Sequence, residues 1–167
     1  MTRDTTITDA EALALKQVKS LNVDEQSMFA VSNVFRVANK VRNFAERTIL
    51  SEHKLTFSGF TVLWVLWING KMESQALANE SGVSKSTLTG IVKTLEKQSI
   101  VVREPDTKDR RRVFVSATPK GKKTMSQIFP EFNLLEAAVT KDLTAQEKNS
   151  LARMLRIVLH SLDQHGE

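Results

Sequence analysis

The sequence contains no cysteine, only three prolines and six glycines, and an aromatic content of 6%. The lack of cysteine excludes disulfides, thiolate zinc sites and thiol-based peroxide sensing. No run of 18 or more apolar residues occurs, so the sequence predicts no membrane-spanning helix. No basic-then-apolar leader opens the chain, and we expect a cytoplasmic protein. The scarcity of helix breakers favours a mainly helical fold with a small β-structure.

Positive charge is concentrated in one stretch of the chain. The 167 residues carry 24 Lys and Arg against 19 Asp and Glu, a net charge of +5. Residues 85–123 hold 11 basic and 4 acidic side chains, a net of +7, which leaves −2 for the remainder. Such a localised excess indicates a nucleic-acid footprint. The length predicts one compact domain.

Residues 73–97 predict two short helices joined by a tight turn. The first, residues 73–81, has an apolar side at Ala76, Leu77 and Ala78, and Gly82 after it tolerates the left-handed conformation that ends a helix. Ser84 is a favourable N-cap for the second helix, residues 85–97. That helix repeats apolar residues at spacings of three and four. It is about 20 Å long and fits a major groove, so the pattern indicates a helix-turn-helix.

A basic hairpin is predicted to follow this helix pair. Residues 100–103 and 112–117 are β-prone, and Pro105-Asp106 supplies turn chemistry between them. The loop carries Arg110 and Arg111 near its tip. A β-ribbon tipped with arginine can reach the narrow, negative minor groove of DNA.

The hairpin and its exit resemble a known motif. Residues 109–121 match the pattern D-x-R-x-x-x-V-x-L-T-x-x-G of the multiple antibiotic resistance regulator (MarR) family at Asp109, Arg111, Val115, Thr118 and Gly121. Ala117 stands where that pattern has leucine. The helix pair resembles the same family at Leu77-Ala78, Val83-Ser84, Leu88-Thr89 and Leu95-Glu96-Lys97, and the similarity extends over about residues 24–163.

The resemblance implies a homodimeric, ligand-responsive transcription factor with a winged helix-turn-helix lobe and a helical dimerisation lobe. We expect an N-terminal extension at residues 1–23, dimerisation helices at residues 24–53 and 119–164, and the DNA-binding lobe at residues 56–118. Two-fold symmetry would place two recognition helices about 34–36 Å apart, one turn of DNA, and so predicts a palindromic operator.

The DNA contacts are expected from the second helix and the hairpin. For the major groove the candidates are Lys85, Ser86, Thr87, Thr89 and Lys93, with Ser84 at the start of the helix. Because serine and threonine discriminate poorly between bases, we expect DNA shape to add specificity.

The remaining candidates surround this helix. Ser74, Gln75 and Arg103 are expected at phosphates. Either Arg110 or Arg111 is expected in the minor groove, with Asp109 orienting an arginine and Arg112 completing the basic cluster. Which arginine inserts and which braces the hairpin stays open. The alternative for the cluster is a solvated, salt-bridged hairpin.

The flanking segments predict long helices. Residues 9–21 form a short helix that Asp9 caps and that docks on the dimer, or else covers a ligand pocket. Asp24 caps a helix to about residue 51, and its apolar stripe is longer than one lobe needs. Residues 56–70 are apolar nearly all round and predict a buried helix.

Two more helices are predicted after the hairpin. Pro119 suits the first position of a helix that Pro130 kinks or interrupts and that continues to about residue 142. Thr144 and Glu147 form a T-x-x-E capping box that starts the last helix.

The sequence says least about which residues would bind a small ligand. In the resembled family, effectors such as phenolic acids lodge where the dimerisation helices meet the winged-helix lobe. Arg42, His53 and Trp64 are the candidates here, since aromatic walls with a cationic side chain suit an aromatic acid. The alternative is that Trp64 belongs to the core and Arg42 is solvated. The three histidines are scattered, and we expect no metal and no cofactor.

Two other function classes make different demands on the sequence. An enzyme would need a nucleophile with a base, paired carboxylates or metal ligands, and no G-x-S-x-G, H-E-x-x-H or glycine-rich phosphate loop occurs. We therefore expect no enzyme. The second alternative is an architectural, RNA-binding or protein-interaction winged helix without ligand control, which predicts little preference among DNA sequences.

Overall fold

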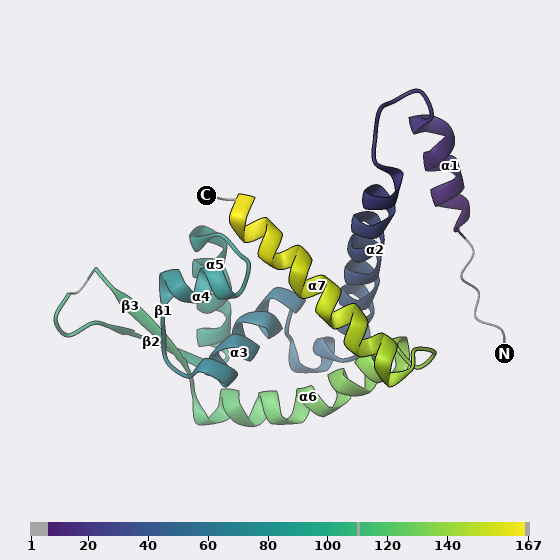
Figure 1. Cartoon of the computed structure of the whole chain (residues 1–167). Coiled ribbons are helices and arrows are strands. Elements are labelled where there is room, and N and C mark those ends of the chain that lie inside the picture. Colours follow the sequence, from purple (N-terminus) through teal and green to yellow (C-terminus); the bar gives the residue numbers. More distant parts are fainter. Residues whose placement is uncertain (1–6, 110, 166–167) are drawn as a thin grey trace.

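The computed structural model describes residues 7–109 and 111–165. In chain order the elements are α1 (Asp9–Val18), α2 (Glu25–Thr48), the 3₁₀ helix η1 (Leu50–His53), α3 (Phe57–Asn69), β1 (Met72–Glu73), α4 (Ser74–Glu80), α5 (Lys85–Lys97), β2 (Val101–Pro105), β3 (Val113–Ala117), α6 (Pro119–Val139) and α7 (Ala145–His165). Helices α3 to α5 and the sheet form one lobe, from which α2, α6 and α7 extend (Figure 1). The predicted mainly helical fold with a small β-wing is confirmed.

The core of the lobe is built around α3, which is apolar on nearly every side. Its Val62, Leu63 and Leu66 are at most 1% exposed. The buried side chains that α4, α5, β3 and α6 contribute to this core include Leu77, Leu88, Val92, Leu95, Val115, Met125 and Ile128. Full burial of one such side chain stabilises the fold by about 1.5–3 kcal/mol. Packing against α3 therefore holds these short helices, which would be marginal alone.

The sheet has the antiparallel order β1-β3-β2. Val115 of the central strand lies opposite Met72 of β1 and Arg103 of β2. The hairpin of β2 and β3 projects from the lobe as a wing (Figure 1). Strand β1 was not predicted: Glu73 was placed in a helix, but it lies in β1 and is the N-cap of α4. A two-residue strand is too short to show alternation.

Most helix starts lie where the sequence placed them. Asp24 Oδ1 accepts the N–H of Ser27 at 3.1 Å, and Ser84 Oγ accepts the N–H of Thr87 at 3.1 Å. Pro119 is the first residue of α6, and the capping box ahead of α7 forms. The prediction for α1 was wrong by one residue. Its cap is Thr8, which forms a capping box with Glu11, so Asp9 is already helical.

Some helix ends also differ from the prediction. Helix α1 stops at Val18 rather than at residue 21. Helix α2 stops at Thr48 rather than at about residue 51, and the 3₁₀ helix η1 follows it. Helix α6 is not interrupted at Pro130 and ends at Val139. Pro130 is exposed, so water can satisfy the carbonyl that the missing N–H leaves free.

The outer helices present apolar side chains to solvent. Helix α7 has no buried residue, and the one buried residue of α2 is Ala45, near its C-terminal end. The exposed large hydrophobics of these two helices are Val31, Val34, Phe35, Val37, Phe44, Leu151, Met154, Ile157, Val158, Leu159 and Leu162. Across the described ranges, no helix combines the length and apolarity that crossing a membrane requires.

A close backbone approach joins the sheet to α6. Thr118 Oγ1 accepts the N–H of Gly121 at 3.0 Å and donates to the carbonyl of Ser99 at 2.8 Å. The Thr118 N–H donates to the Ile100 carbonyl at 3.1 Å. A Cβ at Gly121 would lie 2.0 Å from that carbonyl oxygen, so only glycine fits there.

We expect Gly121→Ala to lower the free energy of unfolding by about 2–3 kcal/mol, because backbone must shift to admit the methyl group. Gly90→Ala is the matched control. A Cβ at Gly90 meets nothing within 4 Å, and alanine favours a helix interior by about 1 kcal/mol. Guanidinium unfolding at a fixed protein concentration measures both. Equal stability of Gly121→Ala and the wild type would contradict the close approach.

Candidate nucleic-acid interface

Helix α5 divides into a buried face and an exposed polar face. Leu88, Val92 and Leu95 point into the core. The exposed side chains opposite them are those predicted for the major groove, Lys85, Ser86, Thr87, Thr89 and Lys93. Burial of the apolar face therefore fixes which side chains the helix presents to solvent.

Several of the predicted polar groups are engaged within the chain. Ser84 Oγ caps α5 and lies 2.9 Å from Ser86 Oγ and 2.8 Å from Thr87 Oγ1. Thr89 Oγ1 donates to the Lys85 carbonyl at 2.9 Å, which leaves its lone pairs free to accept. Ser84 is thus the N-cap that the sequence predicted. Its predicted contact with DNA stays a prediction.

The start of α4 is tied to the sheet and to itself. Ser74 Oγ donates to the Val113 carbonyl of β3 at 2.9 Å. Gln75 Nε2 donates to Asn79 Oδ1 at 3.2 Å and stays exposed. The first contact joins the helix-turn-helix to the wing across 39 positions of sequence.

A hollow of about 160 Å³ lies between α4, α5 and the wing. Three cationic side chains from different elements line it: Lys85 from α5, Arg103 from β2 and Arg111 from the wing loop. The rest of its lining is Glu73, Ser74, Gln75, Leu88, Thr89, Val92, Val113 and Val115. The fold therefore gathers predicted site residues that are up to 37 positions apart.

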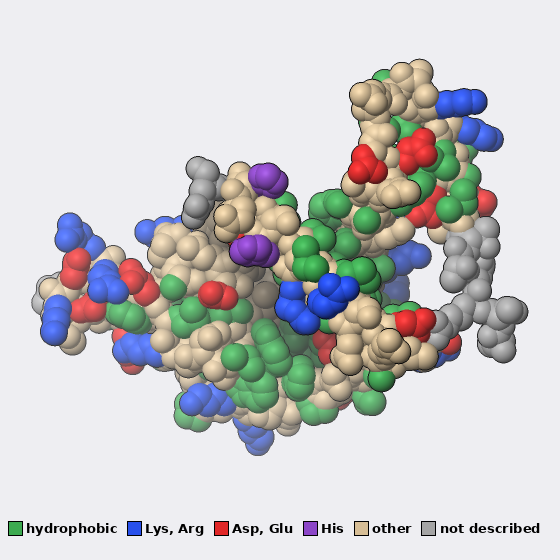
Figure 2. Space-filling view, in the orientation of Figure 1, with side chains coloured by type: hydrophobic (Ala, Val, Ile, Leu, Met, Phe, Trp, Pro, Cys, Tyr) green, Lys and Arg blue, Asp and Glu red, His purple; other side chains and the backbone are tan. Residues whose placement is uncertain are grey.

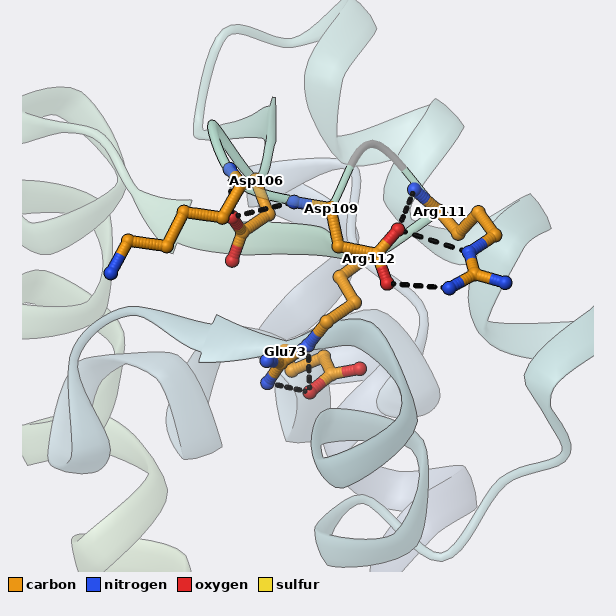
Figure 3. Close-up of polar contacts among 6 residues, drawn as sticks. Glu73, Asp106, Asp109, Arg111 and Arg112 are labelled. Carbon is orange, nitrogen blue, oxygen red and sulfur yellow. Dashed lines mark hydrogen bonds and ion pairs between the residues drawn. The ribbon is translucent and has the colours of Figure 1, made fainter.

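The wing loop is ordered by two carboxylates. Asp106 Oδ1 accepts the N–H of Lys108 at 2.6 Å and that of Asp109 at 3.2 Å. Asp109 binds the Arg111 guanidinium through both oxygens, at 3.0 Å to Nε and 3.1 Å to Nη2 (Figure 3). The Arg111 side chain is still 90% exposed, so it is oriented without being buried.

These contacts keep both carboxylates ionised. Amide donors hold the pKa of Asp106 below its usual value, and the Arg111 side chain, then its amide, lowers the pKa of Asp109. Because the folded-state pKa values are depressed, the contacts stabilise the loop above the ordinary carboxyl pKa. Their contribution is lost as pH falls through the folded-state values.

Three other basic side chains near the wing are paired with acids. Arg103 Nη2 lies 2.5 Å from Glu96 Oε2 of α5, and Arg112 Nη2 lies 2.6 Å from Glu73 Oε2. Lys71 pairs with Glu104. Arg110 lies outside the described residues. Figure 2 shows Lys and Arg around the wing with acidic side chains among them.

Comparison with known proteins identifies the architecture. The model of the MarR family matches residues 55–113, from the residue before the Thr56 cap of α3 to the start of β3. The uncharacterized HTH-type transcriptional regulator YwaE of Bacillus subtilis (strain 168) is 35% identical over 151 residues, which cover 89% of this chain and 88% of that relative. The chain belongs to the MarR family.

Other relatives agree with this assignment. The HTH-type transcriptional regulator MgrA of Staphylococcus aureus is 26% identical over 87% of this chain and 96% of its own length. The crystal structure of NadR in complex with 4-hydroxyphenylacetate is similar with a TM-score of 0.66 and 28% identity, over 75% of this chain and 89% of that one. YwaE and MgrA are named as transcriptional regulators, and this MarR-family chain is a transcriptional regulator.

The three candidates for a ligand site lie in different surroundings. His53 lines a shallow pocket with Glu52, Lys54, Gln98, Ile100, Lys120 and Thr124. Trp64 stacks on Phe129 with ring centroids 4.6 Å apart, as the core alternative predicted, although it stays partly exposed. Arg42 lies over the Phe57 ring at 5.5 Å. No three His, Asp or Glu gather as metal ligands within the described ranges.

The acidic partners of the basic residues were not predicted from the sequence. Glu73, Glu96 and Glu104 each pair with a cation from another part of the chain. Their partners lie between 7 and 39 positions away, so no local spacing reveals them. The only available signal was the presence of acidic residues inside an otherwise basic stretch.

Proposed function

We propose that this protein is a sequence-specific DNA-binding regulator that acts as a homodimer on a palindromic promoter site. It acts mostly as a repressor and is released by a small aromatic acid. The observation that carries the proposal is the hollow in which Lys85, Arg103 and Arg111 converge beside the exposed face of α5. Three cations from three elements suit the phosphates that flank a groove.

The recognition helix meets the major groove with small polar side chains. With 13 residues, α5 is about 20 Å long and fits that groove. Ser86, Thr87 and Thr89 accept or donate at base edges, whereas Lys85 and Lys93 lie at phosphates. Because hydroxyls discriminate weakly, the shape of the DNA supplies part of the specificity.

The wing supplies Arg111 to the minor groove. This side chain is the most exposed of the ion-paired arginines and is already oriented by Asp109. Arg103 exchanges Glu96 for a phosphate, and Gln75 donates to phosphate from the start of α4. Ser74 and Ser84 hold the helix-turn-helix in shape through the Val113 carbonyl and the cap of α5, next to the DNA backbone.

The dimer uses the outer helices. A single chain leaves apolar rows of α2 and α7 in water, which is unfavourable by about 25 cal/mol for each Å² that a partner would cover. A second copy with the same rows buries them around a two-fold axis. That axis sets two α5 helices about 34–36 Å apart, one turn of DNA.

An effector acts between the two lobes. NadR, 28% identical, is bound to 4-hydroxyphenylacetate in its solved complex. Arg42 over the Phe57 ring and Trp64 stacked on Phe129 offer this chain a cation and aromatic surfaces. The ligand favours a spacing of the α5 helices that does not match one DNA turn, since a ligand without such a preference shifts nothing.

The first test measures DNA binding and the part of Arg111 in it. The wild type should bind the duplex upstream of its own gene more tightly than an unrelated duplex, with two chains per site. Arg111→Ala should weaken binding about tenfold and reduce the slope of log affinity against log salt by about 0.9, the value for one phosphate contact. Fluorescence anisotropy at several salt concentrations measures both quantities.

Lys16→Ala of α1 is the matched control, since it removes a cation outside the lobe and should leave the slope unchanged. An unchanged slope for Arg111→Ala would remove the wing from the mechanism. Equal affinity for both duplexes would favour the architectural or RNA-binding alternative.

The second test concerns the dimer. Leu159 on α7 is 61% exposed in the single chain. Leu159→Glu should raise the dimer dissociation constant at least about a hundredfold, because the carboxylate would be buried without a partner. Analytical ultracentrifugation measures the constant, and Asn149→Glu on the same helix is the charge-matched control. A dimer that tolerates Leu159→Glu would contradict the use of α7.

The third test concerns the effector. An aromatic acid such as 4-hydroxyphenylacetate should release the wild-type protein from its duplex, whereas the corresponding uncharged amide should not, because Arg42 pairs with a carboxylate. Arg42→Gln should weaken the response about tenfold and leave DNA affinity without ligand unchanged. Release by the amide and the acid alike would exclude a carboxylate site.

A further inference from the structure

The side chain of Arg112 turns away from the tip of the wing toward the body of the lobe. Its Nε and Nη2 both donate to Glu73 Oε2, at 3.1 and 2.6 Å. Arg111, one position earlier, points in a different direction and binds Asp109 (Figure 3). The Arg112 side chain is 50% exposed and that of Glu73 is 32% exposed, so the pair is partly shielded.

Glu73 stands where the sheet meets the helix-turn-helix. It is the last residue of β1 and the N-cap of α4, yet its side chain makes no capping hydrogen bond. The carboxylate instead binds the wing. The next residue, Ser74, donates to the Val113 carbonyl at 2.9 Å. Two adjacent residues at the start of α4 are therefore tied to two adjacent residues at the start of β3.

The backbone of Arg112 closes the wing loop at the same place. Its N–H donates to the Asp109 carbonyl at 2.9 Å, and its carbonyl accepts the N–H of Asp106 at 2.9 Å. Asp106 and Asp109 are the two carboxylates that order the loop and orient Arg111. A displacement of Arg112 would therefore also displace the loop residues that orient Arg111.

We infer that Arg112 is a positioning residue which, through Glu73, sets the angle of the wing to the recognition helix and so places Arg111 at the DNA. Arg112 itself makes no phosphate contact in this arrangement. The inference rests on the proposed function, in which Arg111 enters the minor groove. It replaces the sequence-based expectation that Arg112 binds DNA directly.

For the removal of the Glu73 carboxylate, the inference predicts a change in DNA affinity opposite in sign to that expected from electrostatics alone. Removing a carboxylate from a DNA-facing lobe lowers repulsion by phosphates and should raise affinity. If Glu73 holds the wing in place, its removal lowers affinity instead. Glu104→Gln is the control. Glu104 lies on strand β2 of the wing and is also ion-paired. Its partner, Lys71, precedes β1 and does not close the wing loop.

The experiment compares Glu73→Gln with Glu104→Gln on the duplex that the wild-type protein selects from a random library. We expect Glu73→Gln to weaken binding about three- to fivefold, the range of one partly exposed ion pair, and to reduce the salt slope by about one although no cation is lost. Glu104→Gln should bind as tightly as the wild type or more tightly, with its slope unchanged.

Two double variants identify the route. In an Arg111→Ala background, Glu73→Gln should not weaken binding further, since the group that it positions is gone. In a Glu73→Gln background, Arg112→Gln should likewise cost little. A full additional loss of slope on Arg112→Gln in that background would show a direct phosphate contact and overturn the inference.

The remaining outcomes separate the inference from the proposed function. If Arg111→Ala weakens binding but Glu73→Gln strengthens it as Glu104→Gln does, the wing acts without this brace and only the inference fails. If Arg111→Ala has no effect, or selection enriches no sequence, the proposed function fails and the inference with it. Equal losses in Glu73→Gln and Glu104→Gln would also overturn a specific role for Arg112.

A charge-reversed double variant distinguishes loss of the ion pair from misfolding. Glu73→Arg combined with Arg112→Glu keeps the ion pair with the charges exchanged. It should recover at least half of the affinity that Glu73→Gln loses, while thermal unfolding confirms that each variant is folded. Failure of the folded reversed pair to recover any affinity would contradict a positioning role for the ion pair.

Discussion

The burial of Leu88, Val92 and Leu95 against α3 is the contact on which the DNA-facing surface depends. It fixes the rotation of α5 about its axis, so that small polar residues face outward. A rotation by one residue, about 100°, would carry hydroxyls into the core, where each unpaired one costs about 1–3 kcal/mol. Several apolar side chains share this restraint, and the recognition helix is therefore the best fixed part of the interface.

The wing is held by weaker forces of another kind. Its hairpin projects from the lobe, and the ion pairs that attach it, those of Arg112 and Arg103, are exposed or partly exposed. Each such pair contributes only about 0–1 kcal/mol and is screened by salt. Hydrogen bonds from Ser74 to β3 and along the sheet add to them. The wing is therefore held to the lobe less firmly than α5.

Local chemistry explains why much of this architecture could be predicted from the sequence. Ser84, Pro119 and the Thr144–Glu147 box mark helix starts within a few residues of themselves, and the spacing of Leu88, Val92 and Leu95 gave α5 its bounds. The two-residue strand β1 and the pair of Glu73 with Arg112 left no comparable pattern. Partners 39 positions apart become neighbours only through the sheet register, which sequence spacing does not contain.

The same ties restrict how an effector can act. Within a lobe, α5 is fixed by the core and the wing by Glu73 and Ser74, so the recognition helix and wing of one chain move together. The apolar rows of α2 and α7 lie outside this unit. A ligand among the outer helices would therefore change the distance between two whole lobes rather than the shape of either one. In the proposed dimer both α5 helices must fit grooves one turn apart, so a change in that distance alone would be enough to abolish DNA binding.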